Sequence, residues 1–157
     1  MDWSYVAGYF DADGSASIAV SNRGGFFVSM DAKICFSGSI PTLEAIRRFL
    51  HEQDVKSNKP IEPIHSKLNP WGKSSHFYLR GDDAIIRFLE EVSPFIVEKN
   101  ESLLILVDMI LQKRSIKNNG GIIADNLKLL EPYRESIHKL AKKGPIALVP
   151  IVQREKN

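Results

Sequence analysis

Apolar and polar residues alternate along two neighbouring stretches of the N-terminal half. From Val28 to Phe36 every even-numbered residue is apolar, whereas most odd-numbered residues are polar. A period of two is typical of a strand with one buried face, so residues 27–37 are predicted to form such a strand. Residues 15–23 repeat the pattern, and the glycines at 24–25 predict a turn between the two stretches. The pair is therefore predicted to form an antiparallel hairpin.

A second hairpin is predicted over residues 61–68 and 74–80, which flank a sequence rich in turn residues. In its last strand Phe77 and Leu79 are expected to face the core. Apolar residues spaced as on one side of a helix predict helices at 41–53, 83–92 and 125–142. Strongly apolar segments at 3–12, which also contains small residues, and at 98–113 are predicted to be helical as well. Asp82 is expected to cap the helix at 83–92.

The predicted order is helix, two strands, helix, two strands, helix, followed by helical C-terminal residues. This αββαββα order predicts an α+β fold with an antiparallel sheet and extra C-terminal helices. Residues 1–157 are expected to form a single domain, with a core at about 3–113, a helical part at about 114–144 and a tail at about 145–157. Roughly the first 100 residues have no second copy in the chain.

Composition excludes several classes of protein. The 157 residues are 43% apolar and 25% charged, which is typical of a globular domain. No apolar run reaches the roughly 18 residues of a membrane helix, so no membrane partner is expected. The N-terminus lacks the basic start of a signal peptide. Cys35 is the only cysteine, which excludes an intrachain disulfide and a cysteine-rich zinc site. We expect an intracellular protein, cytoplasmic in a prokaryote or within an organelle.

Small residues recur every four positions in the first predicted helix, at Ser4, Gly8 and Ala12. They therefore line one side of the helix, where a second helix can approach closely. In a symmetric dimer this stripe meets its own copy, and the helix ends bring the two Asp13 carboxylates together. Adjacent carboxylates repel each other unless cations lie between them, and their oxygen atoms suit Mg²⁺.

The two acids of this helix, Asp11 and Asp13, also have other interpretations. Asp-X-Asp-Gly sequences are common in turns, and aspartate often caps helices, so the acids can be purely structural. A calcium-binding EF-hand loop is excluded, because positions 5, 6 and 12 counted from Asp11 hold Ser15, Ala16 and Asn22. The net charge of +2 is weak support for a nucleic-acid partner, although a local basic surface does not need a large total charge.

Residues 6–14, VAGYFDADG, resemble the LAGLIDADG signature of homing endonucleases. Six of the nine letters match, including the whole DADG, and the other three positions keep apolar residues. The αββαββα order that follows is also similar to that of the family. The resemblance covers residues 3–113 and implies a saddle-shaped antiparallel sheet. It also implies a site-specific endonuclease that cuts both strands of a long double-stranded DNA site, as in intron homing.

The resemblance also implies a set of site residues. A single motif implies a homodimer on a pseudo-palindromic site, with Ser4, Ala7, Gly8, Asp11 and Ala12 at the dimer interface. The last acid of the motif, Asp13, becomes the catalytic metal ligand, joined by the backbone carbonyl of Ala12. A basic residue after a Pro-Phe step corresponds to Lys99. A polar residue that positions water corresponds to Ser39; if Gly38 occupies that place instead, the role is absent. The implied cofactor is Mg²⁺ or Mn²⁺, with Ca²⁺ binding without supporting cleavage, and no small-molecule cofactor is implied.

The outward faces of the two hairpins are the candidates for reading DNA, because a β-ribbon fits the major groove. The strand pattern assigns Ser17, Ser21, Arg23, Ser29, Asp31, Lys33, His65, Lys67, His76, Tyr78 and Arg80 to these faces. Phosphate contacts are expected from Lys73 in the second turn and from Lys113, Arg114 and Lys117 after the long helix. Each of these side chains can instead be an ordinary solvated surface residue.

Two other functions remain open at this point. The chain can bind DNA or intron RNA without cutting it, as a maturase does, but both motif acids are present, which favours cleavage. It can also be a structural dimer whose small-residue stripe is only an interface. That second interpretation leaves the polar outward faces of the hairpins unexplained.

Overall fold

The computed structural model describes residues 1–23, 27–60, 74–116, 122–123 and 128–141, with backbone only at 22–23, 27–28 and 122–123. Its elements are α1 (Trp3–Asp13), β1 (Gly14–Arg23), β2 (Phe27–Gly38), α2 (Ile40–Glu52), β3 (Ser75–Tyr78), α3 (Asp82–Val92), α4 (Asn100–Ile116) and β4 (Ile122–Ile123). A further helix spans 131–141. The predicted α+β class is confirmed. Within the described residues, no helix is long and apolar enough to cross a membrane.

The sheet is built around the long antiparallel hairpin of β1 and β2. Gly14 pairs with Phe36 at one end of the hairpin, and Arg23 pairs with Phe27 at the other. Because β1 occupies one edge of β2 along its whole length, β3 and β4 share the other edge. β3 pairs with residues 35–38 and β4 pairs with residues 27–28. The predicted hairpin of residues 15–23 and 27–37 is confirmed.

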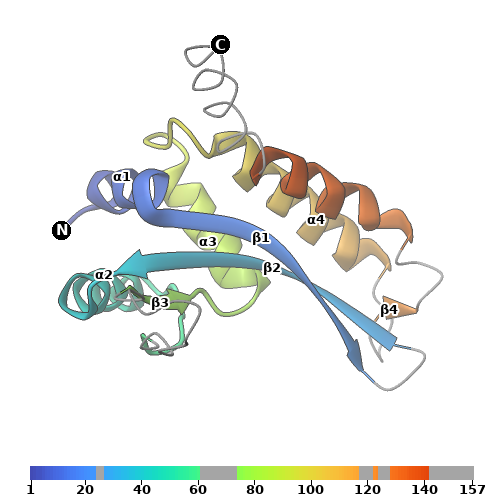
Figure 1. Ribbon diagram of the computed structural model, residues 1–157, viewed down its shortest axis with the longest axis horizontal. Coiled ribbons are helices and arrows are strands. Elements are labelled where there is room, and N and C mark those ends of the chain that lie inside the picture. Colours follow the sequence, from blue (N-terminus) through green and yellow to red (C-terminus); the bar gives the residue numbers. More distant parts are fainter. Residues whose placement is uncertain (24–26, 61–73, 117–121, 124–127, 142–157) are drawn as a thin grey trace, which may run out of the picture.

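Among the described residues, helices pack against one face of this sheet. Figure 1 shows α1, α4 and the 131–141 helix on the same side of the curved β1–β2 ribbon. Met30, Ile34 and Phe36 on that side of β2 have no exposed surface, and they belong to one core cluster with residues of α1 to α4. The period-two alternation therefore assigned the buried face of β2 correctly.

Several local expectations differ from the structure. Gly81 is the N-cap residue of α3, and Asp82 lies inside the helix without a capping hydrogen bond. Asp82 instead forms an ion pair with Lys113 of α4. The short strand β4 was not predicted, since two residues carry no periodicity. The predicted strand at 61–68, its turn and residues 125–127 and 142 of the last predicted helix lie outside the described residues.

Candidate active site

Helix α1 presents a different kind of residue on each side. Its inward residues Val6, Ala7 and Phe10 are fully buried. Asp2 begins the helix as its N-cap, because its carboxylate accepts the Tyr5 amide N–H at 2.8 Å. Ser4, Gly8 and Ala12 are exposed on the outward side, and Asp13 is exposed at the end of the helix. The predicted stripe thus exists as an exposed surface that ends beside an exposed carboxylate.

Ala7 does not belong to that exposed stripe. It was assigned to the dimer interface together with Ser4, Gly8, Asp11 and Ala12, but it has no exposed surface. Its position, one residue before Gly8, turns it by about 100° around the helix and into the core. The Ala7 side chain is therefore part of the interior of its own chain.

Gly14 allows the chain to pass directly from α1 into β1. A Cβ atom at this position would lie 2.1 Å from a ring carbon of Phe10, which belongs to the buried core. Only glycine fits against that fixed ring, so the last letter of the DADG sequence has a packing reason. The same packing fixes where Asp13 leaves the helix.

Asp11 and Lys99 hold the end of α1 against the segment that precedes α4. The Asp11 carboxylate accepts backbone N–H groups from Val97 at 2.7 Å and from Lys99 at 3.1 Å. In return, the Lys99 Nζ atom donates to the carbonyl of Phe10 at 2.9 Å and to that of Asp11. The two predicted residues Lys99 and Asp13 are therefore brought to the same helix end, although 86 positions separate them.

Burial lowers the pKa of the Lys99 ammonium group, and the nearby carboxylates oppose this shift. Desolvation is the main cause, while Asp11, Asp13 and Glu98 favour the charged form of Lys99. The influence of Asp13 on Lys99 follows from their proximity at the end of α1. A cation at this place can stabilise negative charge that develops on a phosphate.

Ser39, the predicted water-positioning residue, lies at the start of α2. It is the N-cap residue of that helix, and its Oγ atom is 3.0 Å from Oγ1 of Thr42. Ser37 lies two residues earlier, on the outward face of β2, where its Oγ atom is 3.9 Å from Sγ of Cys35. Because Phe36 pairs with Gly14, Ser37 lies level with the end of α1. That pairing makes Ser37 a candidate for the water-positioning role. Only the strand register, which the structure shows, distinguishes it from Ser39.

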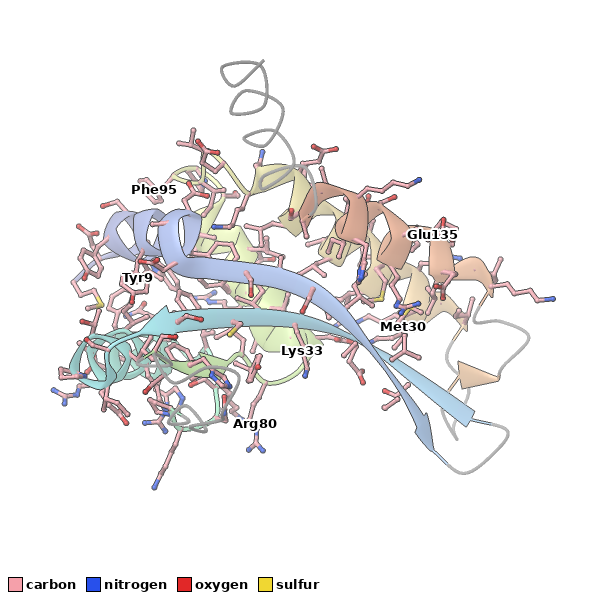
Figure 2. All side chains as sticks on the ribbon, viewed as in Figure 1. Tyr9, Met30, Lys33, Arg80, Phe95 and Glu135 are labelled. Carbon is pink, nitrogen blue, oxygen red and sulfur yellow. The ribbon has the colours of Figure 1, made fainter. Side chains whose placement is uncertain are left out.

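Tyr9 is a second residue that the sequence analysis left without a role. Its hydroxyl donates a hydrogen bond to the Ser37 carbonyl at 2.7 Å. Figure 2 shows Tyr9 between α1 and the end of β2. Burial raises the pKa of the Tyr9 hydroxyl, and the Asp13 carboxylate raises it further. Tyr9 therefore joins the helix that carries Asp13 to the strand that carries Ser37.

The oxygen ligands at the end of α1 suit a hard cation but are too few in one chain. The Asp13 carboxylate and a backbone carbonyl are the kind of oxygen donor that Mg²⁺ prefers. Within the described part of the chain, no group of three or more His, Cys, Asp or Glu side chains is arranged to hold a metal ion. A second Asp13, from another copy of the chain, would complete the donor set.

The outward face of the sheet carries polar side chains in cross-strand rows. Ser17 pairs with Lys33, Ser21 pairs with Ser29, and Ser37 pairs with His76. Nζ of Lys33 lies 4.9 Å from the centre of the Tyr78 ring, and the rings of His76 and Tyr78 meet edge to face. Figure 2 shows Lys33 and Arg80 extending from the side of the sheet that faces away from α4. These predicted DNA-reading residues therefore lie on one surface.

Lys113 was expected to contact a phosphate, but the structure shows it buried between two carboxylates. Only 6% of its surface is exposed, and its ammonium lies 2.6 Å from Asp82 and 3.4 Å from Asp31. A buried cation held by two carboxylates is not free to bind a phosphate, so that assignment is wrong. Arg114 is half-exposed and forms an ion pair with Asp83. Asp31 remains half-exposed on the outward face, beside Ser29.

Some of the predicted DNA contacts lie outside the described residues. These are the side chains of Arg23, His65, Lys67, Lys73 and Lys117. Arg80 is exposed and lines an open groove with Lys56 and Arg87, next to the start of α3. The described part of the outward face is thus a surface of serines, aromatic rings and cations with one carboxylate.

Comparison with solved structures shows which fold this arrangement belongs to. The archaeal intron-encoded homing endonuclease I-Vdi141I, in complex with DNA, matches with a TM-score of 0.68 and 18% identity, over 90% of this chain and 85% of that chain. The homing endonuclease I-TnaI matches with a TM-score of 0.63 and 12% identity, over 91% of this chain and 97% of that chain. I-SmaMI, bound to an uncleaved DNA target in the presence of calcium ions, has a TM-score of 0.65 and 16% identity, over 88% of this chain and 45% of that chain.

No protein-family model matches the sequence, and no curated protein matches it. At these low identities the structural matches establish the fold, which is that of the LAGLIDADG homing endonucleases. The resemblance inferred from residues 6–14 and from the order of the elements is confirmed at that level.

Proposed function

We propose that this chain, which has the fold of the LAGLIDADG homing endonucleases, cuts both strands of a long, pseudo-palindromic DNA site as a metal-dependent homodimer. One observation carries the proposal. Asp13 is exposed at the end of α1, where an exposed stripe of small residues ends and where the Lys99 ammonium lies. The stripe allows a second α1 to approach, and the approach brings two Asp13 carboxylates together. The DNA complexes of fold relatives such as I-Vdi141I support a DNA partner.

Each residue of the site has a part in the proposed reaction. Asp13 and the Ala12 carbonyl would hold the divalent ion, Mg²⁺ or Mn²⁺. When bound, this ion polarises the scissile phosphate and lowers the pKa of a water molecule. Lys99 stabilises the negative charge that develops on the phosphate oxygens. Asp11 keeps Lys99 in place through the two backbone hydrogen bonds of its carboxylate. Each chain of the dimer acts on one strand.

The outward face of the sheet is proposed to read the DNA bases. Lys33 and Arg80 suit the acceptor groups of guanine, and Asp31 can accept a hydrogen bond from cytosine N4. Ser17 opposite Lys33 and Ala19 opposite Asp31 are short, so the DNA can approach the strands closely. This face carries the specificity, while the end of α1 carries the chemistry.

The test is selection and cleavage of a randomised library of DNA sites. Binding is selected first with Ca²⁺, which is expected to support binding without cleavage, and Mg²⁺ then starts the reaction. We expect double-strand cuts at one near-palindromic sequence by the native protein. Asp13→Asn should bind the selected site and leave it intact, whereas Asp108→Asn, an exposed acid on α4, should cut normally.

Two outcomes would contradict the proposal. Equal cleavage by native protein and Asp13→Asn would remove the catalytic role of Asp13. Selective retention of DNA or of a structured intron RNA by the native protein, with no cleavage in Mg²⁺ or Mn²⁺, would instead support the non-cleaving, maturase-like alternative.

A further inference from the structure

Tyr9 and Gly38 fit together at the place where β2 ends. The Tyr9 hydroxyl donates to the Ser37 carbonyl at 2.7 Å. A Cβ atom added to Gly38 would lie 1.9 Å from the oxygen of that hydroxyl and 3.3 Å from the ring carbon that carries it. The hydroxyl therefore occupies the space that any side chain at position 38 would need.

This contact lies directly beside the proposed catalytic carboxylate. Tyr9 precedes Asp13 by four residues, so the two side chains lie on the same side of α1. The effect of the Asp13 carboxylate on the pKa of Tyr9 agrees with this proximity. On β2, Ser37 follows Phe36, which pairs with Gly14 at the start of β1. One hydrogen bond thus joins the turn of α1 that leads to Asp13 and the strand position that lies level with it.

We propose that Tyr9 is a positioning residue for DNA cleavage, because its hydroxyl fixes the path of β2 through Ser37 and Gly38 and so holds the Ser37 hydroxyl beside Asp13. The inference rests on the proposed endonuclease function. In this proposal, Ser37 is the polar group that forms a hydrogen bond with the attacking water. The Ser39 hydroxyl contacts Thr42 at the start of α2 instead. The LAGLIDADG letters have leucine where this chain has Tyr9, so the contact depends on a residue in which this chain departs from the motif.

A stability cycle tests the contact without any use of DNA. Gly38→Ala places a methyl group against the Tyr9 hydroxyl, and we expect its Tm to fall by about 4 °C or more. Tyr9→Phe removes the hydroxyl, so the methyl group then meets only a ring carbon at a distance that small shifts can absorb. The double variant should regain the part of the loss that the hydroxyl causes, whereas the backbone strain of a side chain at Gly38, where φ is +156°, remains. Additive effects of the two substitutions would overturn the contact.

Single-turnover cleavage tests the functional part. With protein in excess over the selected site, Tyr9→Phe should slow Mg²⁺-dependent cleavage about tenfold, the order of effect of one lost hydrogen bond. Its Kd for DNA, measured in Ca²⁺, should stay within about twofold of the native value, since base contacts are unchanged. Ser37→Ala should slow cleavage to a similar degree. Adding Tyr9→Phe to Ser37→Ala should slow it little further, because Tyr9 acts through Ser37.

The controls separate the possible failures. Tyr133→Phe, which deletes a hydroxyl on the 131–141 helix, should leave both cleavage and Kd unchanged. Native cleavage rates in Tyr9→Phe, or a further tenfold loss in the double variant, would overturn the positioning role while the endonuclease function stands. If the native protein cuts no DNA, the endonuclease function fails together with the role of Tyr9 in cleavage. The stability cycle would still report whether the contact with Gly38 exists.

Discussion

Cys35 shows how position on the sheet sets the chemistry of one residue. It lies on the outward face but is only 9% exposed, because Ser15 and Tyr78 are its partners on the neighbouring strands. Burial raises the pKa of its thiol, and hydrogen bonds from Ser37, Ser15 and Tyr78 oppose that shift only in part. At neutral pH the thiol is therefore protonated and a poor nucleophile.

Alkylation of Cys35 by iodoacetamide should accordingly be slower in the native protein than in the urea-unfolded chain. A raised pKa means that the thiolate forms only at higher pH, so the rate in the native protein should also reach its half-maximum at a higher pH. Both rates are measured by mass spectrometry across a pH series. The same pH midpoint in both states would contradict a raised thiol pKa, and a slow rate alone would then reflect limited access.

Lys113 is the residue whose environment departs most from its expected role. Its ammonium is held by Asp31 and Asp82, whereas the ion pair of the adjacent Arg114 is exposed. Lys113→Met should lower the free energy of unfolding by about 2 kcal/mol, because two partly buried carboxylates lose their cation. Arg114→Met should change it by less than about 1 kcal/mol. Urea denaturation measures the free energy of unfolding of both variants. Equal losses would show that burial of the Lys113 ion pairs adds nothing to stability.

At the residue scale, the motif predicted the role of Asp13, and Gly14 after it indicated that the residue lies at a helix end. Lys99 was predicted through the family resemblance, and its location at the same helix end depends on how two distant elements meet. The Lys113 ion pairs could not be predicted, because residues 31, 82 and 113 come from three separate elements. Tyr9 was treated as an apolar replacement, since a hydroxyl gains its role only from a partner on β2.

At the scale of elements, aromatic rings join α1 to the elements beneath it. The ring of Phe88 on α3 lies 5.6 Å from Phe10, 5.7 Å from Phe36 and 6.3 Å from Trp3, measured between ring centres. Phe88 is fully buried, so it connects α3, α1 and β2 at one point. This cluster supports the helix end that carries Asp13.

Phe88→Ala should therefore lower the free energy of unfolding by about 3–5 kcal/mol, since it removes a buried ring and leaves a cavity. Phe95→Ala provides the control, because 47% of the Phe95 surface is exposed. That change should cost less than about 1 kcal/mol. Thermal and urea unfolding measure both variants. A small effect of Phe88→Ala would mean that the cluster around α1 tolerates a cavity.

Element boundaries were predictable where a single periodicity dominates. The alternation in β2 and the apolar stripes of α1, α2 and α3 gave those elements within one or two residues. α4 begins at Asn100 and extends to Ile116, beyond the predicted 98–113, and its apolar residues surround the helix too evenly to mark an end. β3 covers only Ser75–Tyr78, and Leu79 forms a single bridge with Ser57. Ser57 lies between the predicted helix at 41–53 and the predicted strand at 61–68, and no local pattern indicates such a pairing.

At the scale of the whole molecule, the two proposed functional surfaces lie on different sides of the chain's own core. In the proposed function, the outward sheet face contacts DNA, and the outward stripe of α1 contacts a second chain. One chain offers a single Asp13 carboxylate, so the proposed metal site and the proposed symmetric DNA site both require the dimer. Dimerisation and cleavage should therefore be lost together when the stripe alone is altered.

Gly8→Gln makes that alteration without harming the single chain. A Cβ atom at Gly8 meets nothing within 4 Å, and glutamine is a better helix former than glycine by about 0.5–1 kcal/mol. The folded monomer should thus keep or gain stability, while the longer side chain separates the two helices in a dimer. Sedimentation equilibrium should give twice the chain mass for the native protein and the chain mass for Gly8→Gln. Double-strand cleavage should be lost in the variant.

Ala45→Gln is the matched control, because it places the same side chain at an exposed position of a different helix, α2. It should leave mass, Tm and cleavage unchanged. If Gly8→Gln remains dimeric and active, the interface lies elsewhere, and cleavage does not need the two Asp13 carboxylates to meet through α1. A Gly8→Gln protein that unfolds would instead show that the outward side of α1 is needed within one chain. Loss of dimerisation and cleavage in a variant that remains folded is the result that ties the active site to the meeting of two α1 helices.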